Sequence, residues 1–526
     1  MQRPKVVIIG GGFGGMFTAK KLQKLSQGDL DIELISKINY FVYQPLLPEV
    51  AAGTLNPQDA VTPLRNLLKG VQVRLAEVTD IDFDAKQITL LQGQRKILQQ
   101  VDYDHLVITT GQVANLSLFP GFEHHSLTMK DLSDAYRLRN RVIECMEMAD
   151  VTRFPDIKQR ALTFVVGGAG FSGVETMGEL AEMVDRILPE YPNIQRHEIR
   201  LVIIQIGHRV LPELPEHLSE YALNQLEKRG VEVWLNTGIH SATQHAIYTN
   251  DGRSLPTRTI VTTIGNGPSE FVKSLPIALQ RGRIAVSAEL EVIGLSNVWS
   301  IGDAALVPLN TDQESPLYAP PTAQFAVAQA EVLAHNILHR TRGQNLVTFT
   351  HKAAGIMASL GGGRGVAEIY GRRVTGIPAW LIWRAAYIGM LPGLATKIRV
   401  ALDWFFDLFM PRTIVYMAES DRPAARYLDY SKGEVVQHAN EVPAGFYIVL
   451  SGSLTQELER DDGEPDHHEL RIGDSWGSRA LKEHRLTHGK ITAREDTRLL
   501  LVNSGDFQRL RSSYEPLNEL LSAGNK

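Results

Sequence analysis

The sequence predicts an α/β fold class in which two strand–turn–helix units are followed by amphipathic helices and a small β-roll. Three observations predict it. Two glycine-rich loops, at residues 10–15 and 168–173, each follow a short β-branched run. Apolar residues recur at helical spacing between residues 397 and 410, and after Asp421 the chain changes to short strands separated by glycine turns. The 526 residues are enough for three domains of ordinary size.

Both glycine loops fit a Rossmann-type dinucleotide-binding unit. Residues 10–15 read GGGFGG after the run Val6–Ile9, and residues 168–173 read GAGFSG after Phe164–Val166. Glycines let the backbone approach a pyrophosphate, and the N-terminus of the following helix presents unpaired N–H groups to it. One such loop is also found as a turn that binds nothing. Two in one chain predict two dinucleotides, and therefore a flavin enzyme supplied by a nicotinamide nucleotide.

The predicted strands divide the chain into five segments. The first unit continues with strands at 32–35 and 105–108, the second with strands at 201–204 and 260–265, and the chain returns to the first unit at 298–303. We expect a split FAD-binding domain around an inserted nucleotide domain, then two smaller segments. The expected ranges are FAD-binding 1–115 and 286–375, NAD(P)H-binding 116–285, an amphipathic membrane-associating segment 376–417 and a β-roll 418–526.

The aspartate at position 303 follows a glycine at the end of the returning strand. A carboxylate there can accept hydrogen bonds from the ribityl hydroxyls of a flavin nucleotide. The alternative is that Asp303 caps the helix that begins next to it.

Composition excludes several classes of protein. A net charge of −5 gives no reason to expect nucleic acid as a partner. Cys145 is the one cysteine, which excludes an internal disulfide framework and the thiol pair that a disulfide reductase needs. The chain runs from Met1 directly into its first strand, so no signal peptide is expected. No apolar run reaches the length of about 20 residues that spans a bilayer, and no metal-ligand spacing is found.

Five stretches of the sequence carry a family resemblance. They are 10–15, 39–47 (NYFVYQPLL), 170–175 (GFSGVE), 301–304 (IGDA) and 320–329 (PPTAQFAVAQ). Over about residues 5–415 the chain resembles the type II NADH:quinone oxidoreductases. The resemblance implies that NADH or NADPH gives a hydride to FAD and that two electrons pass on to a membrane quinone, without proton pumping.

Site residues follow from this resemblance position by position. It implies that Glu175 handles a proton or positions the nicotinamide, although a first-turn glutamate is also favoured by the helix dipole. Gln324 and Gln329 lie about 140° apart on a helix, so Gln324 is the stronger quinone contact and Gln329 is a structural alternative. Lys352 matches a basic residue near the quinone. The FAD contacts are Gly10, Gly12, Gly14, Gly15, Thr110, Gly111, Asp303, Thr322 and Ala323, and the nicotinamide contacts are Gly168, Gly170, Gly173 and Gly265.

The chain departs from the family at the ends of two strands. Ser36 stands where most relatives place a carboxylate on the adenosine ribose, so FAD is expected to depend more on the glycine loop and Asp303. Gln205 stands where NADH-preferring relatives have a glutamate, with Arg209 four residues further on. Because a carboxylate would repel the 2′-phosphate, the glutamine predicts that NADPH is accepted. The alternative is that Gln205 still binds the 2′-hydroxyl and that NADH is preferred.

A quinone comes from a bilayer, so the chain needs a way to lie on one. Ile398, Leu402, Phe405 and Phe409 form an apolar stripe, and a polar stripe of Arg399, Asp403 and Asp407 runs beside it. With Pro411 expected to end the helix and Trp404 expected at the lipid interface, the segment predicts monotopic attachment to the cytoplasmic face of a membrane. The alternative is a core or dimer-interface helix, and a homodimer stays open.

The region after about residue 418 resembles the cyclic-nucleotide-binding β-roll. Where that family has a glutamate, this chain has Ser478, in Trp476-Gly477-Ser478. Thr487 aligns with the family's phosphate-binding arginine. We therefore expect weak or no cyclic nucleotide binding, unless Arg479 or Arg485 binds the phosphate by another route. Two rival functions are a reductase of a biosynthetic naphthoquinone precursor and a redox-sensing regulatory flavoprotein. A sulfide:quinone reductase is disfavoured because that chemistry needs several thiols.

Overall fold

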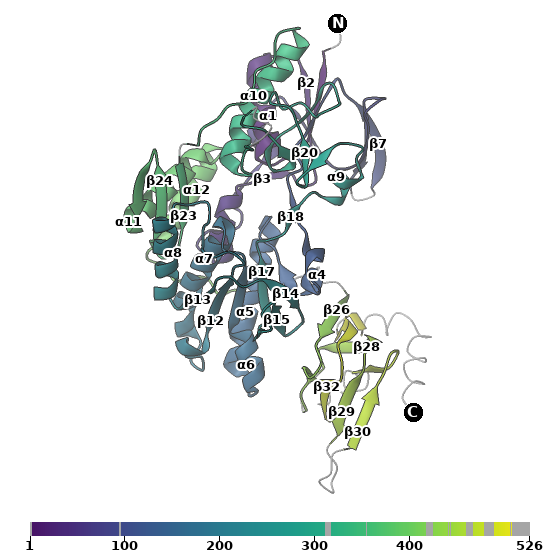
Figure 1. Cartoon of the computed structure of the whole chain (residues 1–526), viewed down its shortest axis with the longest axis vertical. Coiled ribbons are helices and arrows are strands. Elements are labelled where there is room, and N and C mark those ends of the chain that lie inside the picture. The colour runs from purple at the N-terminus through teal and green to yellow at the C-terminus, as the bar shows by residue number, and fades with distance from the viewer. Residues whose placement is uncertain are drawn as a thin grey trace.

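A computed structural model describes residues 3–93, 96–310, 317–353, 355–416, 424–439, 441, 443–458, 466–477, 489–504 and 506–507. Figure 1 shows three parts in a row along the long axis: a unit at the N-terminal end, a second unit below it, and a small β domain at the opposite end. The two larger units each carry one of the glycine loops. The α/β fold class is therefore confirmed.

The first unit is built on a seven-stranded sheet of order β21-β8-β1-β2-β5-β6-β7. β1, the strand before the glycine loop, pairs in parallel with β2 and β8 and is buried on both faces. This burial suits the Val/Ile composition of β1. Helices α1 (Phe13–Ser26) and α10 (Ala323–Thr341) pack against each other beside it. The strands are β1 Lys5–Ile9, β2 Asp31–Ser36, β5 Gln72–Asp82, β6 Gln87–Gln92, β7 Ile97–Asp102, β8 His105–Ile108 and β21 Val298–Ser300.

The second unit is built on a parallel five-stranded sheet of order β10-β17-β11-β12-β13. Helices α5 (Leu132–Val151), α7 (Phe171–Ile187) and α8 (Glu216–Lys228) flank it, and an antiparallel sheet of β14, β15 and β16 covers one end. The strands are β10 Ser126–Leu127, β11 Thr163–Gly167, β12 Arg200–Ile204, β13 Val231–Trp234, β14 Ile239–Ala242, β15 Ala246–Thr249, β16 Ser254–Pro256 and β17 Thr259–Thr262. β21 pairs with β8, so the chain returns to the first sheet after this unit.

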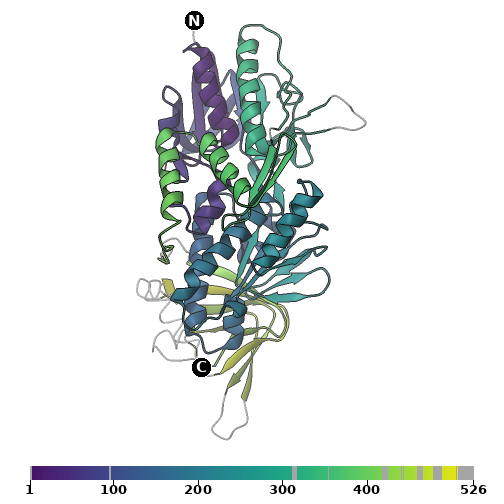
Figure 2. The same cartoon turned by 90° about the vertical axis from the view of Figure 1, so that its left-hand side faces the viewer.

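Two helices follow a small antiparallel sheet of β23 (Gly355–Ser359), β24 (Gly365–Ile369) and β25 (Arg372–Thr375). α11 runs without a break from Gly376 to Met390. Pro378 lies in its first turn, where no N–H is needed, so this proline does not interrupt it. Figure 2 shows α11 and the next helix side by side at the edge of the two large units. No helix within the described residues combines the length and apolar character needed to cross a bilayer.

The expected helix over residues 397–410 is observed as α12, Leu394–Phe406. The prediction that Pro411 ends it is wrong, because the helix ends five residues earlier. The Asp407 carboxylate is bound by Arg186 (3.3 Å) and Arg412 (3.2 Å), and this pairing turns the chain back toward the protein. Residues 407–410 continue as hydrogen-bonded turns.

The C-terminal part is a β-roll of two four-stranded sheets, ordered β26-β33-β28-β31 and β27-β32-β29-β30. It has an apolar core of its own that includes Leu428, Val449 and Leu499. Residues 478–488, on which the expectation about cyclic nucleotides rests, lie outside the described part. The strands are β26 Ala425–Tyr430, β27 Val435–Gln437, β28 Gly445–Ser451, β29 Leu454–Leu458, β30 Asp466–Leu470, β31 Ser475–Trp476, β32 Lys490–Ala493 and β33 Thr497–Asn503.

Candidate nucleotide and quinone sites

The first glycine loop has the shape of a pyrophosphate cradle. Gly10 has φ +110°, and a Cβ there would lie 2.4 Å from the carbonyl oxygen of Thr109. A Cβ at Gly15 would lie 1.9 Å from the Gly10 oxygen, so α1 can pack against the loop only at a glycine. At Gly12 a Cβ would meet nothing within 4 Å. The helix N-terminus that follows has no side-chain cap, so its N–H groups face this open space.

The second loop repeats this geometry. Gly168 has φ +100°, and a Cβ at Gly173 would lie 2.0 Å from the Gly168 oxygen. Gly170 again faces open space, at the uncapped N-terminus of α7. The two loops therefore match at each of their three glycine positions, and both have room for a pyrophosphate over the middle glycine.

Further polar groups surround the first cradle. Thr110 Oγ1 is buried without a hydrogen-bond partner, as expected for an atom that meets a ligand. Ser36 is buried at the end of β2, beside Gly11. Thr322 caps α10 by accepting from the Phe325 N–H (3.4 Å), which places Ala323 at the helix N-terminus. Gly111, with φ +67°, faces open space.

Asp303 lies in a short 3₁₀ turn, Gly302–Ala304, whose N-cap is Ile301 and which has no side-chain cap. The helix-cap alternative for Asp303 is therefore wrong. Burial raises the pKa of its carboxyl, although Lys130 and Arg283 lie close enough to oppose the shift. The side chain is thus a half-buried acceptor close to two cations, at the end of the strand that rejoins the first sheet.

The two glutamines of α10 have different surroundings. Gln329 is 2% exposed, and its Oε1 accepts from the Gly302 N–H at 2.8 Å, so it supports the turn that carries Asp303. Gln324 lies more than one helical turn earlier and is half-buried. Of the two expected roles of Gln329, the structure thus supports the structural one.

Glu175 lies on α7 and is buried where the two large units and α11 meet. Its Oε1 accepts from the Ser359 N–H (3.1 Å) and from Trp383 Nε1 (3.2 Å). Burial raises its pKa to about 8. It lies beyond the first turn of its helix and is 6% exposed, so it is not an ordinary solvated first-turn glutamate. This carboxyl holds its proton at neutral pH.

An aromatic cluster that the sequence analysis did not predict lies against Glu175. Tyr43 packs edge-on to Tyr387 with ring centroids 5.6 Å apart, and Tyr387 lies 4.2 Å from Trp383. Burial raises the pKa of both tyrosines, with Glu175 as a secondary cause. Tyr43 belongs to the NYFVYQPLL stretch, whereas Trp383 and Tyr387 lie in an apolar run that looks like any helix core.

Trp404 corrects a prediction about the membrane interface. It is 4% exposed, and its Nε1 donates to Glu49 Oε2 at 2.7 Å, so it lies inside the protein. Burial raises the pKa of Glu49 to about 8, with nearby Glu179 adding to the shift. The Arg384 guanidinium stacks over the Trp404 ring at 4.6 Å, and its positive charge opposes the rise in the pKa of Glu49. A tryptophan on an amphipathic helix suggested lipid, but the buried carboxyl of Glu49, 3.8 Å from Arg384, provides a stronger partner for the indole N–H.

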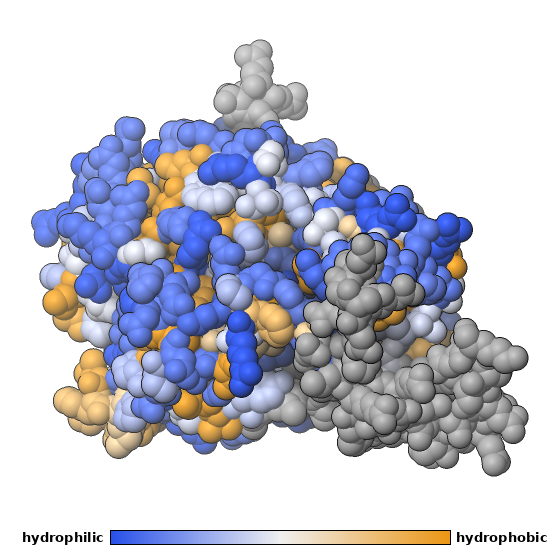
Figure 3. Space-filling model, turned by 90° about the horizontal axis from the view of Figure 1, so that it is seen from below, coloured by the Kyte–Doolittle hydropathy of each residue, from blue (hydrophilic) through white to orange (hydrophobic). Residues whose placement is uncertain are grey.

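The stripes of α12 face opposite ways. The apolar residues are exposed, with Phe405 56% and Phe409 74% accessible. Two of the three polar residues face the protein: Asp403 accepts from the Asn56 N–H (3.0 Å), and Asp407 pairs with Arg186 and Arg412. The third, Arg399, is exposed and lies 3.8 Å from Asp59. Leu394, Ile398 and Leu402 extend the exposed surface, and Ile377, Leu381 and Met390 of α11 are exposed as well. At the other end of the molecule, hydrophobic residues form several separate groups among hydrophilic ones (Figure 3).

At the end of β12, Gln205 is folded onto the second glycine loop. Its Oε1 accepts from the Ala169 N–H at 3.0 Å, so the amide nitrogen is the group left on the side of Gly207. Arg209 donates to the carbonyl oxygen of Pro212 at 2.6 Å instead of extending beside Gln205. Gly265, with φ +75°, closes this region by accepting from the Asn115 N–H at 2.6 Å.

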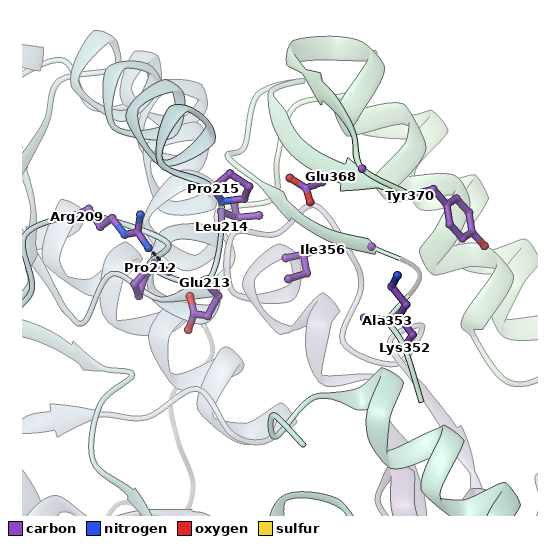
Figure 4. Close-up of a pocket in the computed structure, with 12 residues that line it drawn as sticks. Arg209, Pro212, Glu213, Leu214, Pro215, Lys352, Ala353, Ile356, Glu368 and Tyr370 are labelled. Atoms are coloured by element: carbon purple, nitrogen blue, oxygen red, sulfur yellow. Dashed lines mark hydrogen bonds between the residues drawn. The ribbon is translucent and has the colours of Figure 1, made fainter. Parts of the chain in front are cut away.

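Arg209 and Lys352 lie on one cavity of about 840 Å³ between the second unit and the small β23–β25 sheet. Figure 4 shows them at opposite ends, with Ile356 and Glu368 between them. His351 packs on Phe325 (5.1 Å between ring centroids), so Lys352 also lies near the start of α10. Lys352, the cation expected near the quinone, therefore lies both near the start of α10 and on the cavity that Arg209 also lines.

Two open dinucleotide cradles, one at the start of α1 and one at the start of α7, define a two-dinucleotide oxidoreductase, and the buried carboxyl of Glu175 follows the second. The chain matches the pyridine nucleotide-disulphide oxidoreductase family over residues 4–330, the NDH2 C-terminal domain over 353–413 and the cyclic nucleotide-binding domain over 427–514. It is 32% identical over 382 residues to a type II NADH:quinone oxidoreductase of Staphylococcus haemolyticus (71% of this chain, 92% of the relative). It is also 32% identical over 422 residues to that of Mycobacterium tuberculosis (77% and 88%).

The protein therefore belongs to the type II NADH:quinone oxidoreductase family. Among solved structures, NDH2 from Plasmodium falciparum in complex with NADH shares the fold with a TM-score of 0.72 at 21% identity, covering 79% of this chain and all of that one. The sulfide:quinone oxidoreductase of Aquifex aeolicus is also similar, with a TM-score of 0.61 at 19% identity over 78% and 96% of the two chains.

Proposed function

We propose that the chain is an FAD-dependent NAD(P)H:quinone oxidoreductase that does not pump protons. The observation that carries the proposal is the pair of open glycine cradles, with the buried Glu175 two residues after the second. The relatives named as type II NADH:quinone oxidoreductases support the same reaction. When bound, FAD would accept a hydride from the nicotinamide and pass two electrons to quinone.

The residues present fit both nucleotides. The first cradle, with Gly10, Gly12, Gly14 and Gly15, would hold the FAD pyrophosphate. Thr110 has an unpartnered buried hydroxyl for this ligand, and Asp303 would accept from the ribityl hydroxyls. Gly168, Gly170 and Gly173 would hold the nicotinamide nucleotide. The protein's own contribution is to orient the two rings and exclude water.

Glu175 is the residue we propose to handle a proton. Quinone reduction takes up protons, and this carboxyl retains one at neutral pH because burial raises its pKa. Its Oε1 is fixed by Ser359 and Trp383 on neighbouring elements, so its position is well determined. Gln324 would contact the quinone and Lys352 would add positive charge nearby, while Gln329 would position Asp303 through Gly302.

Asp303→Ala is expected to release FAD. The variant removes a half-buried acceptor close to Lys130 and Arg283 and would leave these two cations beside the ribityl chain. The measurement is the ratio of flavin absorbance to protein after dialysis. Asp84→Ala, at an exposed turn of the same unit, is the control that should keep its flavin. Full flavin retention in Asp303→Ala would contradict the proposed contact.

We propose that the exposed apolar face of α11 and α12 lies on the cytoplasmic face of a membrane, where nicotinamide nucleotides are available. Phe405→Asp with Phe409→Asp places two charges on this face, so co-sedimentation with liposomes should fall at least severalfold. Ile97→Asp with Leu98→Asp is the matched control, because these exposed residues lie on the edge strand β7. Equal sedimentation of wild type and the Phe405/Phe409 variant would show that attachment is elsewhere.

Steady-state turnover tests the function directly. We expect purified protein to oxidise NADH or NADPH with a ubiquinone or plastoquinone analogue as acceptor. Turnover confined to a demethylnaphthoquinone analogue would favour the biosynthetic alternative. No turnover of either nucleotide with any quinone would favour the redox-sensing alternative.

A further inference from the structure

The β-roll is joined to the second unit through a carboxylate. Glu434, just before β27, accepts from Thr243 Oγ1 at 2.9 Å and from the Tyr248 hydroxyl at 3.0 Å, both through its Oε1. Its Oε2 accepts from the Ser431 N–H of the roll at 2.9 Å. Thr243 and Tyr248 belong to the β14–β15 hairpin, so one side chain connects the roll to this hairpin.

Other contacts across the same interface are polar or aromatic: Phe154 stacks on His438 with ring centroids 4.5 Å apart, and His245 lies edge-on to Tyr430 at 5.1 Å. Asp429 Oδ2 lies 3.2 Å from His125 Nε2, and its backbone oxygen accepts from the Gln244 N–H at 2.9 Å. His438 Nε2 lies 2.8 Å from Asp156 Oδ2. The roll and the second unit keep separate apolar cores. A domain with its own core, held to its neighbour by hydrogen bonds and a few ring contacts, can separate from it without unfolding.

The hairpin leads directly to the second nucleotide cradle. A Cβ on Gly167, where the glycine loop begins, would lie 2.7 Å from Ile239 Cδ1 of β14. Just before the hairpin, the Thr237 N–H donates to the Gln205 carbonyl at 2.9 Å and the Asn236 N–H donates to that of Gly207 at 3.0 Å. The element that holds the roll is therefore packed and hydrogen-bonded to the strand end that receives the adenosine ribose.

We infer that docking of the β-roll through Glu434 regulates the affinity for the nicotinamide nucleotide. The docked roll holds the β14–β15 hairpin against Gly167 and the Gln205 strand end, so that the cradle is formed before the nucleotide arrives. Release of the roll leaves the hairpin free to shift and lowers affinity, because part of the binding free energy must then order it. The inference rests on the proposed function, which assigns this cradle to NAD(P)H.

The test is a titration of the full-length protein with NADH and NADPH, followed by quenching of flavin and tryptophan fluorescence. Glu434→Arg loses the acceptor and adds a cation near Arg160, which lies close to Glu434. We expect its nucleotide Kd to rise about fivefold, the lower end of typical coupling between sites, with the KM for quinone unchanged. Small-angle scattering should show a larger radius of gyration.

Removing the same contact from the other side separates coupling from damage to the roll. Tyr248→Phe deletes one of the two hydroxyl donors and leaves the roll sequence and the hydrogen bonds that Thr243 accepts within the hairpin intact, so it should raise the Kd in the same direction. Glu469→Gln is the control, because this roll residue pairs with Arg471 and Arg494 of the roll. A Kd in Glu434→Arg within twofold of wild type overturns the inference. Absence of nucleotide binding in the wild type would instead contradict the proposed function.

Discussion

Glu175→Gln is expected to lower kcat about a hundredfold, the lower range for loss of a positioned proton donor or acceptor. The amide oxygen can still accept from Ser359 and Trp383, since both bonds end on Oε1, so the fold around it should be kept. What is lost is a titratable proton in the place where the two large units and α11 meet. Stopped-flow and steady-state measurements with saturating nucleotide and quinone give kcat for both proteins.

The pH dependence provides a second readout. Burial raises the pKa of Glu175 to about 8, so the wild type should lose turnover as the pH rises through that value, and the variant should lack this alkaline limb. The folded protein also keeps a proton that the unfolded chain releases above its ordinary pKa of 4.5. This group therefore reduces stability as the pH rises from about 5 to about 8, and thermal melting of the variant should show less of that decline.

Glu179→Gln is the matched control, because Glu179 is a second buried glutamate one helical turn further along α7. Its carboxyl accepts from Thr54 at 3.2 Å, whereas the Trp383 indole donates to Glu175, so the kcat of this variant should stay within a few-fold of wild type. A Glu175→Gln enzyme with kcat within threefold of wild type and an unchanged pH profile would remove Glu175 from the reaction.

Gln205→Glu is expected to shift the ratio of kcat/KM toward NADH by about tenfold or more, equivalent to about 1.4 kcal/mol. The glutamate can still accept from the Ala169 N–H, so the loop geometry should stay. The amide nitrogen beside Gly207 is replaced by a carboxylate oxygen, which would repel the 2′-phosphate of NADPH. In the wild type, we expect NADPH to be used with an efficiency comparable to or above that of NADH.

Gln280→Glu adds the same charge at an exposed residue of β19 (Leu279–Gln280) and should leave the ratio unchanged. Arg209 is bound to the Pro212 carbonyl, so its contribution requires that this 2.6 Å bond be exchanged for one to the 2′-phosphate. The prediction is contradicted if the wild type strongly prefers NADH and Gln205→Glu leaves the ratio of kcat/KM unchanged. Gln205 would then bind the 2′-hydroxyl.

The two cradles were predictable from the sequence because their requirements are local. Gly10 and Gly168 need positive φ, Gly15 and Gly173 need the absence of a Cβ, and each follows a β-branched strand within a few residues. The apolar stripe of α12 was likewise visible as a period, since exposure of Phe405 and Phe409 requires only that one helix face remain uncovered.

Partners distant in the sequence decided the rest. Trp404 looked like a lipid anchor until Glu49, more than 350 residues earlier, was found to accept its indole N–H. Gln329 became a support for Gly302, and Glu434 became a link to the β14–β15 hairpin, in the same way. A buried polar atom must find a partner, and a sequence period shows which face a side chain lies on without showing which group will meet it there. Backbone conformation and amphipathicity are thus encoded locally, whereas the chemistry of the buried polar groups is set only when the chain folds.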